Sequence, residues 1–195
     1  MKSNIVKLTE GSAFDRDILR EVEKCTTYNG LSAKETLRVT LLAEELIGML
    51  PNLVAGYTAS FWIENSDKEY EMHAVLEAPR MSLDDRDRIL AVSSTGKNAA
   101  AVGIIGRIRT AIDVMRASAD FPETELIHYN FLDAGITPGP GAYSYLWTLE
   151  SFKESAAEKT EKWDELEKSV IAKMADNVTV GIKGSKIEII VTKTL

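Results

Sequence analysis

Apolar residues recur at three- and four-residue steps in several segments, the pattern of helices that bury one face. In the clearest segment, 32–50, Ser32 and Glu35 have capping-box spacing at the start. Pro51 predicts the end, because proline has no N–H and disfavours helix in the residue before it. We therefore predict a helix over 32–50, with one face made of Val39, Leu42, Ala43, Leu46, Ile47 and Leu50.

The same periodicity predicts further helices, and strict alternation predicts strands. The predicted helices are 14–26, 82–92, 99–117 and a long one over 151–175. The predicted strands are 4–8, a hairpin of 57–64 with 70–77, and a hairpin of 178–183 with 186–192. The glycine- and proline-rich stretch 131–146 is interpreted as a loop, either a lid over a pocket or a surface excursion.

This order of elements predicts the fold class. Hairpins in place of strand–helix–strand units indicate a mostly antiparallel sheet, and helices with single apolar stripes indicate one covered face. We expect a two-layer α+β sandwich that forms a single domain over 1–195. Within it, 1–118 is the core, 119–176 a helical and loop insertion, and 177–195 a closing β-hairpin.

Composition narrows the function classes. Hydrophobic residues make up 45% and charged residues 27%, as in soluble globular proteins. The net charge of −7 argues against a broad nucleic-acid-binding surface. With one cysteine, no apolar run of about 18 residues and no signal peptide at the start, we expect a cytoplasmic protein without a membrane segment.

No complete catalytic motif is present, but one polar loop has the chemistry of a phosphate site. Gly96, Lys97 and Asn98 precede the predicted helix 99–117, where free backbone N–H groups favour an anion. The loop is not a Walker motif, because the required glycine five residues before Gly96 is Ala91. Gly103, within the helix, is interpreted as a point of close packing on a neighbour.

An alternative site lies in the first hairpin. His73 and Glu71 are two residues apart and therefore share one strand face. They could form a metal or catalytic pair, although a half-buried strand histidine without such a role is the favoured interpretation. No nucleophile with an oriented base can be identified.

Three segments resemble the GHKL ATPase superfamily, which includes the ATP-binding domains of gyrase-type topoisomerases, histidine kinases and anti-sigma serine kinases. LLAEELIGML (41–50) resembles the helix that carries the family's N-box. AVLEAP (74–79) resembles the strand that delivers the adenine-binding acid. VGIIGRIRTAIDVM (102–115) resembles the helix after the second glycine box. The similarity runs from about residue 31 to residue 115, and the closing hairpin also fits.

The resemblance implies ATP as the ligand and a Bergerat-like ATP-binding fold. Glu45 would take the place of the catalytic acid and Glu77 that of the adenine-binding acid. The sequence departs from the family where Met49 replaces the expected magnesium-binding asparagine and Pro79 replaces a glycine. A thioether is a poor ligand for a hard cation, so the resemblance gives little support for bound magnesium.

For the phosphates, the resemblance implies contacts from Gly96, Lys97, Asn98 and Gly103. It therefore predicts ATP binding in a bacterial-type signalling or regulatory role, with weak or absent hydrolysis. Whether the chain is an enzyme stays open.

The alternative is a degenerate, non-catalytic member that serves as a protein-interaction or dimerisation module. The segments 131–146 and 151–175 are additions that would provide a surface for a protein partner or a second copy. The nucleotide hypothesis requires that Glu45 and Glu77 border one common cleft.

Overall fold

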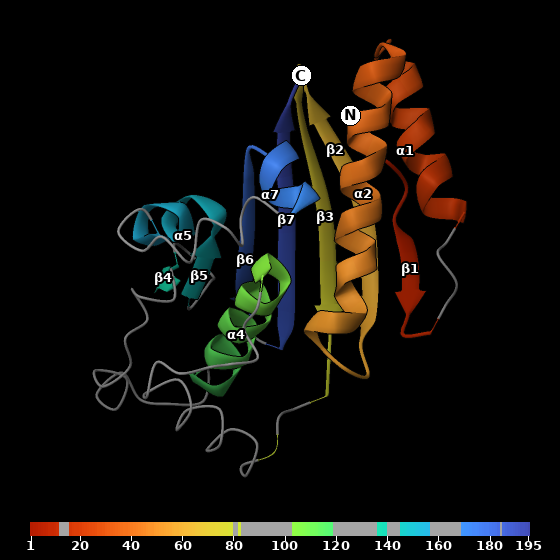
Figure 1. Cartoon of the computed structure of the whole chain (residues 1–195). Helices are drawn as coiled ribbons and strands as arrows, with labels where there is room; N and C mark the ends of the chain where they lie inside the picture. Colours follow the sequence, from red (N-terminus) through yellow and green to blue (C-terminus); the bar gives the residue numbers. More distant parts are fainter. Residues whose placement is uncertain are drawn as a thin grey trace.

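The computed structural model describes residues 1–11, 16–79, 82, 103–118, 136–139, 145–156, 169–183 and 185–195. Figure 1 shows the elements in order along the chain. Their bounds are β1 Val6–Thr9, α1 Arg16–Tyr28, α2 Ala33–Leu53, β2 Thr58–Ser66, β3 Glu69–Glu77, α4 Gly103–Ser118, β4 Ile136–Pro138, β5 Tyr145–Thr148, α5 Leu149–Ala156, α7 Val170–Met174, β6 Asn177–Lys183 and β7 Lys186–Thr194.

The strands form one seven-stranded sheet in the order β1-β2-β3-β7-β6-β5-β4. Every pair in it is antiparallel. Helices α1, α2, α4 and α7 lie over one face of this sheet (Figure 1). The prediction of an α+β fold with an antiparallel sheet is therefore confirmed. None of the described helices is long and apolar enough to cross a membrane.

The central helix α2 begins as predicted but ends later. The Ser32 hydroxyl accepts a hydrogen bond from the Glu35 N–H, and the Glu35 carboxylate accepts one from the Ser32 N–H, which completes the capping box. The predicted end before Pro51 is wrong, because α2 continues to Leu53. A proline in the last turn removes only its own hydrogen bond, and burial of Leu53 and Val54 holds the turn in place.

Both predicted hairpins form, and the second is joined to the first. β3 pairs with β7 along its whole length, so the last strand of the chain lies at the centre of the sheet. The helix-side residues of the three strands β2, β3 and β7 are fully or almost fully buried. They are Ala59, Phe61, Ile63, Tyr70, Met72, Ala74, Leu76, Ile187, Ile189 and Val191.

Two predictions between 131 and 176 are wrong. The stretch 131–146, predicted as loop, contains β4 and the start of β5, which extend the sheet beyond β6. The predicted single helix 151–175 is interrupted at Ser169, whose backbone is extended with φ −92° and ψ 127°. Ser169 instead caps α7 by accepting a hydrogen bond from the Ala172 N–H. The predicted helix 82–92 lies outside the described residues, apart from Ser82.

Candidate functional site

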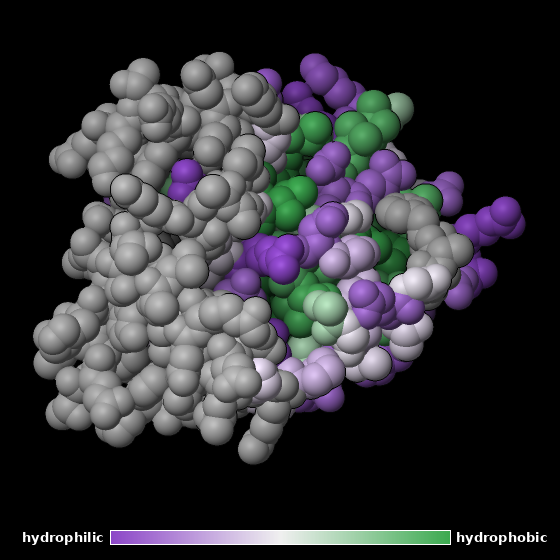
Figure 2. Space-filling model, turned by 60° about the horizontal axis from the view of Figure 1, so that its bottom comes forward, coloured by the Kyte–Doolittle hydropathy of each residue, from purple (hydrophilic) through white to green (hydrophobic). Residues whose placement is uncertain are grey.

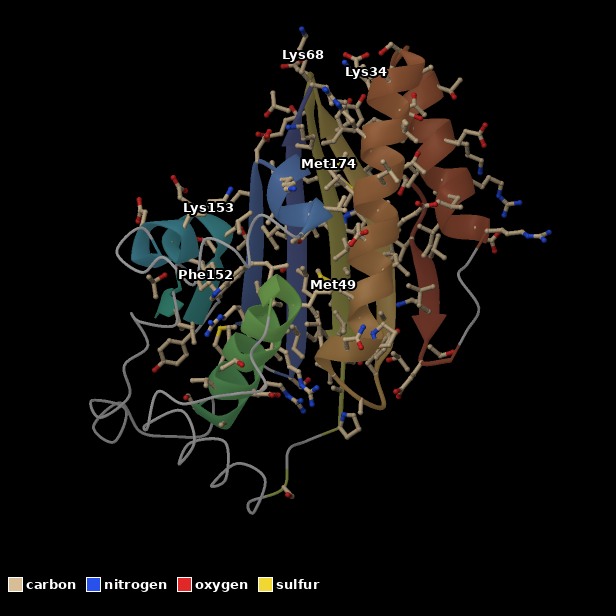
Figure 3. The ribbon with its side chains drawn as sticks, viewed as in Figure 1. Lys34, Met49, Lys68, Phe152, Lys153 and Met174 are labelled. Carbon is tan, nitrogen blue, oxygen red and sulfur yellow. The ribbon has the colours of Figure 1, made fainter. Side chains whose placement is uncertain are left out.

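Glu45 lies on α2, half-buried at the edge of its apolar face. Met49 follows one turn later on the same side, and Figure 3 shows it between α2 and α4. Met49 is 2% exposed and belongs to the hydrophobic core. The position at which the resemblance implies a magnesium ligand is therefore occupied by a buried thioether.

Glu77 is exposed at the end of β3 and points away from the helices. Its strand neighbour Leu76 is fully buried against the helix layer, and side chains alternate along a strand. The Glu77 carboxylate lies 2.8 Å from the Lys186 ammonium on β7. This charge-assisted hydrogen bond lowers the pKa of Glu77 below its ordinary value.

The described structure does not bring Glu45 and Glu77 together. α2 covers one face of the sheet, and the Glu77 side chain belongs to the other. Two pockets lined by described residues contain neither acid: one includes Glu64 and Glu71, and the other lies around Tyr70. A common cleft between the two acids is thus not seen in the part of the chain that the structure describes.

Gly103 begins α4 with a φ of +74°, in the left-handed region that favours glycine. Among the described residues, no atom lies within 4 Å of a Cβ added there. The described residues therefore give no support to the packing interpretation at Gly103, whereas its backbone conformation accounts for the glycine. Gly96, Lys97 and Asn98 lie outside the described residues, so their placement relative to α4 stays a prediction.

α4 carries a half-buried acid between two arginines, which the sequence analysis missed. Arg109 Nε lies 3.8 Å from the carboxylate of Asp113, and this carboxylate is 25% exposed. Burial raises the pKa of Asp113 to about 6, against the opposing effects of Arg109 and Arg116. Arg116 also donates a hydrogen bond to the Pro79 carbonyl, which ties α4 to the residues after β3. The only sequence signal was the spacing of the two arginines around the acid.

The end of the molecule where α2 and β3 finish is seen in Figure 2. Apolar residues reach the described surface there between charged ones. Leu53 and Val54 are nevertheless almost fully buried at this end, while Pro51 and Pro79 are exposed. The core residues at this end are therefore covered, and the two prolines contribute to the exposed surface.

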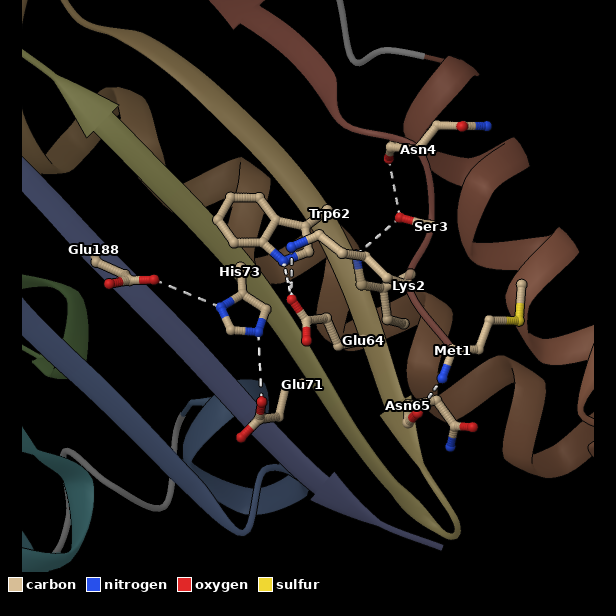
Figure 4. A network of polar contacts seen from close by, with 11 residues as sticks. Met1, Lys2, Ser3, Asn4, Trp62, Glu64, Asn65, Glu71, His73 and Glu188 are labelled. Atoms are coloured by element: carbon tan, nitrogen blue, oxygen red, sulfur yellow. Dashed lines mark hydrogen bonds and ion pairs between the residues drawn. The ribbon is translucent and has the colours of Figure 1, made fainter.

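A second cluster lies on the other side of the sheet, where the sequence analysis had singled out His73 and Glu71. Trp62 on β2 and His73 on β3 are cross-strand partners, and their rings stack at 4.7 Å with an interplanar angle of 6°. His73 Nε2 lies 3.5 Å from Glu71 Oε2, and Nδ1 lies 3.7 Å from Glu188 Oε1 (Figure 4). Among the described residues, no group of three or more histidine, cysteine or acidic side chains could hold a metal ion.

Comparisons of the chain with protein-family models, with curated proteins and with solved structures found no match. The function is therefore argued from the residues themselves, and everything that the GHKL resemblance implies remains a proposal.

Proposed function

We propose that the chain is a nucleotide-binding domain of the histidine kinase-like ATPase type, which binds ATP in a signalling or regulatory role and hydrolyses it weakly or not at all. The ligand lies on the helix side of the sheet, between α2 and the start of α4. The observation that carries this proposal is the left-handed Gly103 at the first residue of α4, five positions after Asn98 in the sequence. Glycine in this conformation lets a loop turn into a helix whose free N–H groups face a phosphate.

Each residue has a distinct role in this proposal. Lys97 and the first N–H groups of α4 neutralise the phosphates. Glu45, half-buried on the same side of α2 as Met49, orients a water or contacts a phosphate-bound cation. Met49 offers that cation no oxygen, which is the reason to expect weak turnover. The form of the nucleotide hypothesis that required Glu45 and Glu77 in one cleft fails, because the Glu77 carboxylate lies on the other face with Lys186. The proposal made here therefore gives Glu77 no role and depends on Glu45 and the start of α4 alone.

The test is a titration with a fluorescent ATP analogue, with and without magnesium. We expect saturable binding by the full chain. Lys97→Ala should weaken binding about tenfold, as expected for loss of a charge-assisted hydrogen bond. Lys34→Ala is the matched control, since Lys34 is exposed in the first turn of α2, at the end of the molecule opposite α4 (Figure 3), and should leave the affinity unchanged. No saturation up to millimolar analogue would contradict the proposal.

The proposed role of Glu45 is tested by comparison with the adjacent acid, Glu44. Glu44 is half-buried like Glu45, but adjacent helix residues point about 100° apart, so only one of the two faces a ligand beside α4. Glu45→Gln should remove the residual ATP hydrolysis or the effect of magnesium on binding, whereas Glu44→Gln should keep both. Equal effects of the two variants would remove Glu45 from the site.

The second candidate function, an interaction or dimerisation module, is favoured by exposed apolar side chains on the helices. Tyr28 on α1 is 79% exposed, Leu37 on α2 57% and Val170 on α7 38%. By contrast, Phe152 on α5 is buried beside Trp147, with ring centroids 5.9 Å apart. Light scattering over a range of concentrations separates the possibilities: a dimer lost in Leu37→Asp supports this function, and a monomer at all concentrations contradicts dimerisation.

A further inference from the structure

The side of the sheet opposite the helices carries an aromatic pair bordered by acids. We call this side the Trp62 face and define it by Trp62, Glu64, Glu71, His73 and Glu188, which alternate with the buried helix-side residues of β2, β3 and β7. Figure 4 shows these side chains in front of the strands, with the helices behind. His73 is only 7% exposed, since its ring lies flat against the indole. The centre of this face is therefore a stacked aromatic pair in which the indole covers the imidazole.

Lys2 shows how the Trp62 face holds a cation. Its ammonium lies 4.5 Å from the Trp62 ring centroid and 2.8 Å from Glu64 Oε1. The Trp62 indole N–H donates to the same carboxylate oxygen at 2.7 Å. An aromatic face next to a carboxylate is a combination that attracts ammonium and guanidinium groups. Within this chain, Lys2 is thus one ammonium group that is bound in this way.

Glu71 and Glu69 are two further carboxylates on the Trp62 face, and neither forms an ion pair with a described lysine or arginine. Among the described residues, no lysine or arginine lies within 4.0 Å of either carboxylate. Together with Glu64 they line an open pocket of about 320 Å³, which is also lined by Lys2 and Met1. His73 Nε2 is buried, faces Glu71 and makes no hydrogen bond with any described residue. The Glu71 carboxylate therefore receives no hydrogen bond from His73 and can accept one from an outside donor.

We propose that the Trp62 face binds a basic peptide segment of a partner protein. An arginine or lysine of that segment lies in the pocket beside the Trp62–His73 pair and donates to Glu71 and Glu69. Guanidinium fits best, because it gives paired donors to a carboxylate. This surface is separate from the proposed nucleotide site, which lies on the helix side of the sheet.

Charge decides against two other occupants. In a two-fold dimer through this face, the same patch of both copies would meet, which sets Glu69 and Glu71 against their own counterparts. A nucleic acid would bring phosphates to the same acids. A basic segment is the occupant whose charge complements the surface, and it also matches the net charge of −7 of the whole chain.

The proposal is tested on the full chain with a defined probe, an acetylated and amidated hexapeptide of alternating arginine and valine. Its citrulline–valine analogue keeps the shape and removes the charge. Binding is followed in ¹H–¹⁵N NMR spectra at about 0.15 M salt, where weak surface attraction is largely screened. The indole N–H of Trp62 is assigned with Trp62→Phe. We expect saturable shifts of this signal and of β2 and β3 amides, and none with the citrulline peptide.

Matched variants separate this site from general charge attraction. Glu69→Gln/Glu71→Gln should weaken the affinity at least about tenfold, as loss of charge-assisted hydrogen bonds implies. Glu23→Gln/Glu154→Gln removes the same charge from exposed positions on α1 and α5 and should change it less than about twofold. Equal weakening in both variants, shifts confined to the helices, or no saturation with the arginine peptide would overturn the proposal. A dimer that Trp62→Ala dissociates would do so too, since it would assign the face to a second copy.

Discussion

Alternate residues of the same central strands make the two faces of the sheet, and these two faces differ in chemistry. Toward the helices, Phe61, Met72 and Ile189 are fully buried, and packing accounts for them. On the Trp62 face, Trp62 and His73 are held by stacking and by contacts with acids. Burial of apolar side chains on the helix side supplies most of the stability of these strands. Residues on the other side are therefore less constrained by folding and can bind a partner.

The largest test of this comparison uses two neighbours on β2. Phe61→Ala should lower the free energy of unfolding by about 3–5 kcal/mol, because it leaves a cavity in the core. Trp62→Ala should lower it by about 1–2 kcal/mol, from a half-buried ring and a cross-strand pair. Urea unfolding followed by far-UV circular dichroism measures both. Equal losses would mean that the Trp62 face stabilises the fold as much as the core does.

The next test concerns Asp113, the half-buried acid of α4. The pKa of Asp113 is raised from 3.8 to about 6, so the folded state binds the proton more tightly than the unfolded state. Its favourable contribution is complete below about pH 4 and is lost as the pH rises to about 6. Asp113→Asn should therefore stabilise the protein at pH 8 by about 2 kcal/mol and leave it nearly unchanged at pH 4.

Thermal unfolding at both pH values checks this prediction. Taking the difference between variant and wild type removes the opposite pH dependence of Glu21 and Asp176, whose pKa values are lowered. A destabilised variant at pH 8 would show that the contact of Asp113 with Arg109 outweighs its burial.

Local patterns explain what could be predicted from the sequence. The capping box at Ser32 and the apolar period of α2 are short-range signals, and each hairpin carries its own alternation. The strand β5 depends instead on pairing with β6, about 30 residues further along the chain. Its neighbours Pro138 and Gly139 are typical of loops, so the sequence indicated a loop there. The break at Ser169 was missed because serine also occurs within helices.

The alternation of apolar and polar residues in the sequence already predicts the orientation of Glu77. In YEMHAVLE the residues Tyr70 and Leu76 fall on one strand face, while Glu71 and Glu77 fall on the other. Alternation alone places Glu77 away from any helix layer that Leu76 packs against. The family resemblance implies the opposite orientation, and the structure agrees with the alternation.

A smaller effect is expected at the start of α2. Ser32→Ala removes the side chain that accepts the Glu35 N–H and should lower the free energy of unfolding by about 1 kcal/mol. Amide hydrogen exchange should become faster in the first turn of α2, because its N–H groups lose an acceptor. Ser66→Ala, exposed at the end of β2, is the control and should change stability by less than about 0.5 kcal/mol. No difference between the two variants would mean that tertiary packing alone fixes the start of α2.

The last test compares Gly48 in α2 with Gly103 in α4. Among the described residues, a Cβ added at either position would meet no atom within 4 Å. Gly48 is exposed within α2 and its φ is not positive, so Gly48→Ala should stabilise the fold by up to about 1 kcal/mol. Gly103 has a φ of +74°, so Gly103→Ala should destabilise it by about 1 kcal/mol. Thermal unfolding of both variants, combined with the ATP-analogue titration, links this pair to function. If Gly48→Ala is more stable and binds normally, its glycine is not needed for the ligand. If Gly103→Ala folds and still binds normally, the turn into α4 is not part of the nucleotide site, and the helix side loses its main support as the functional face.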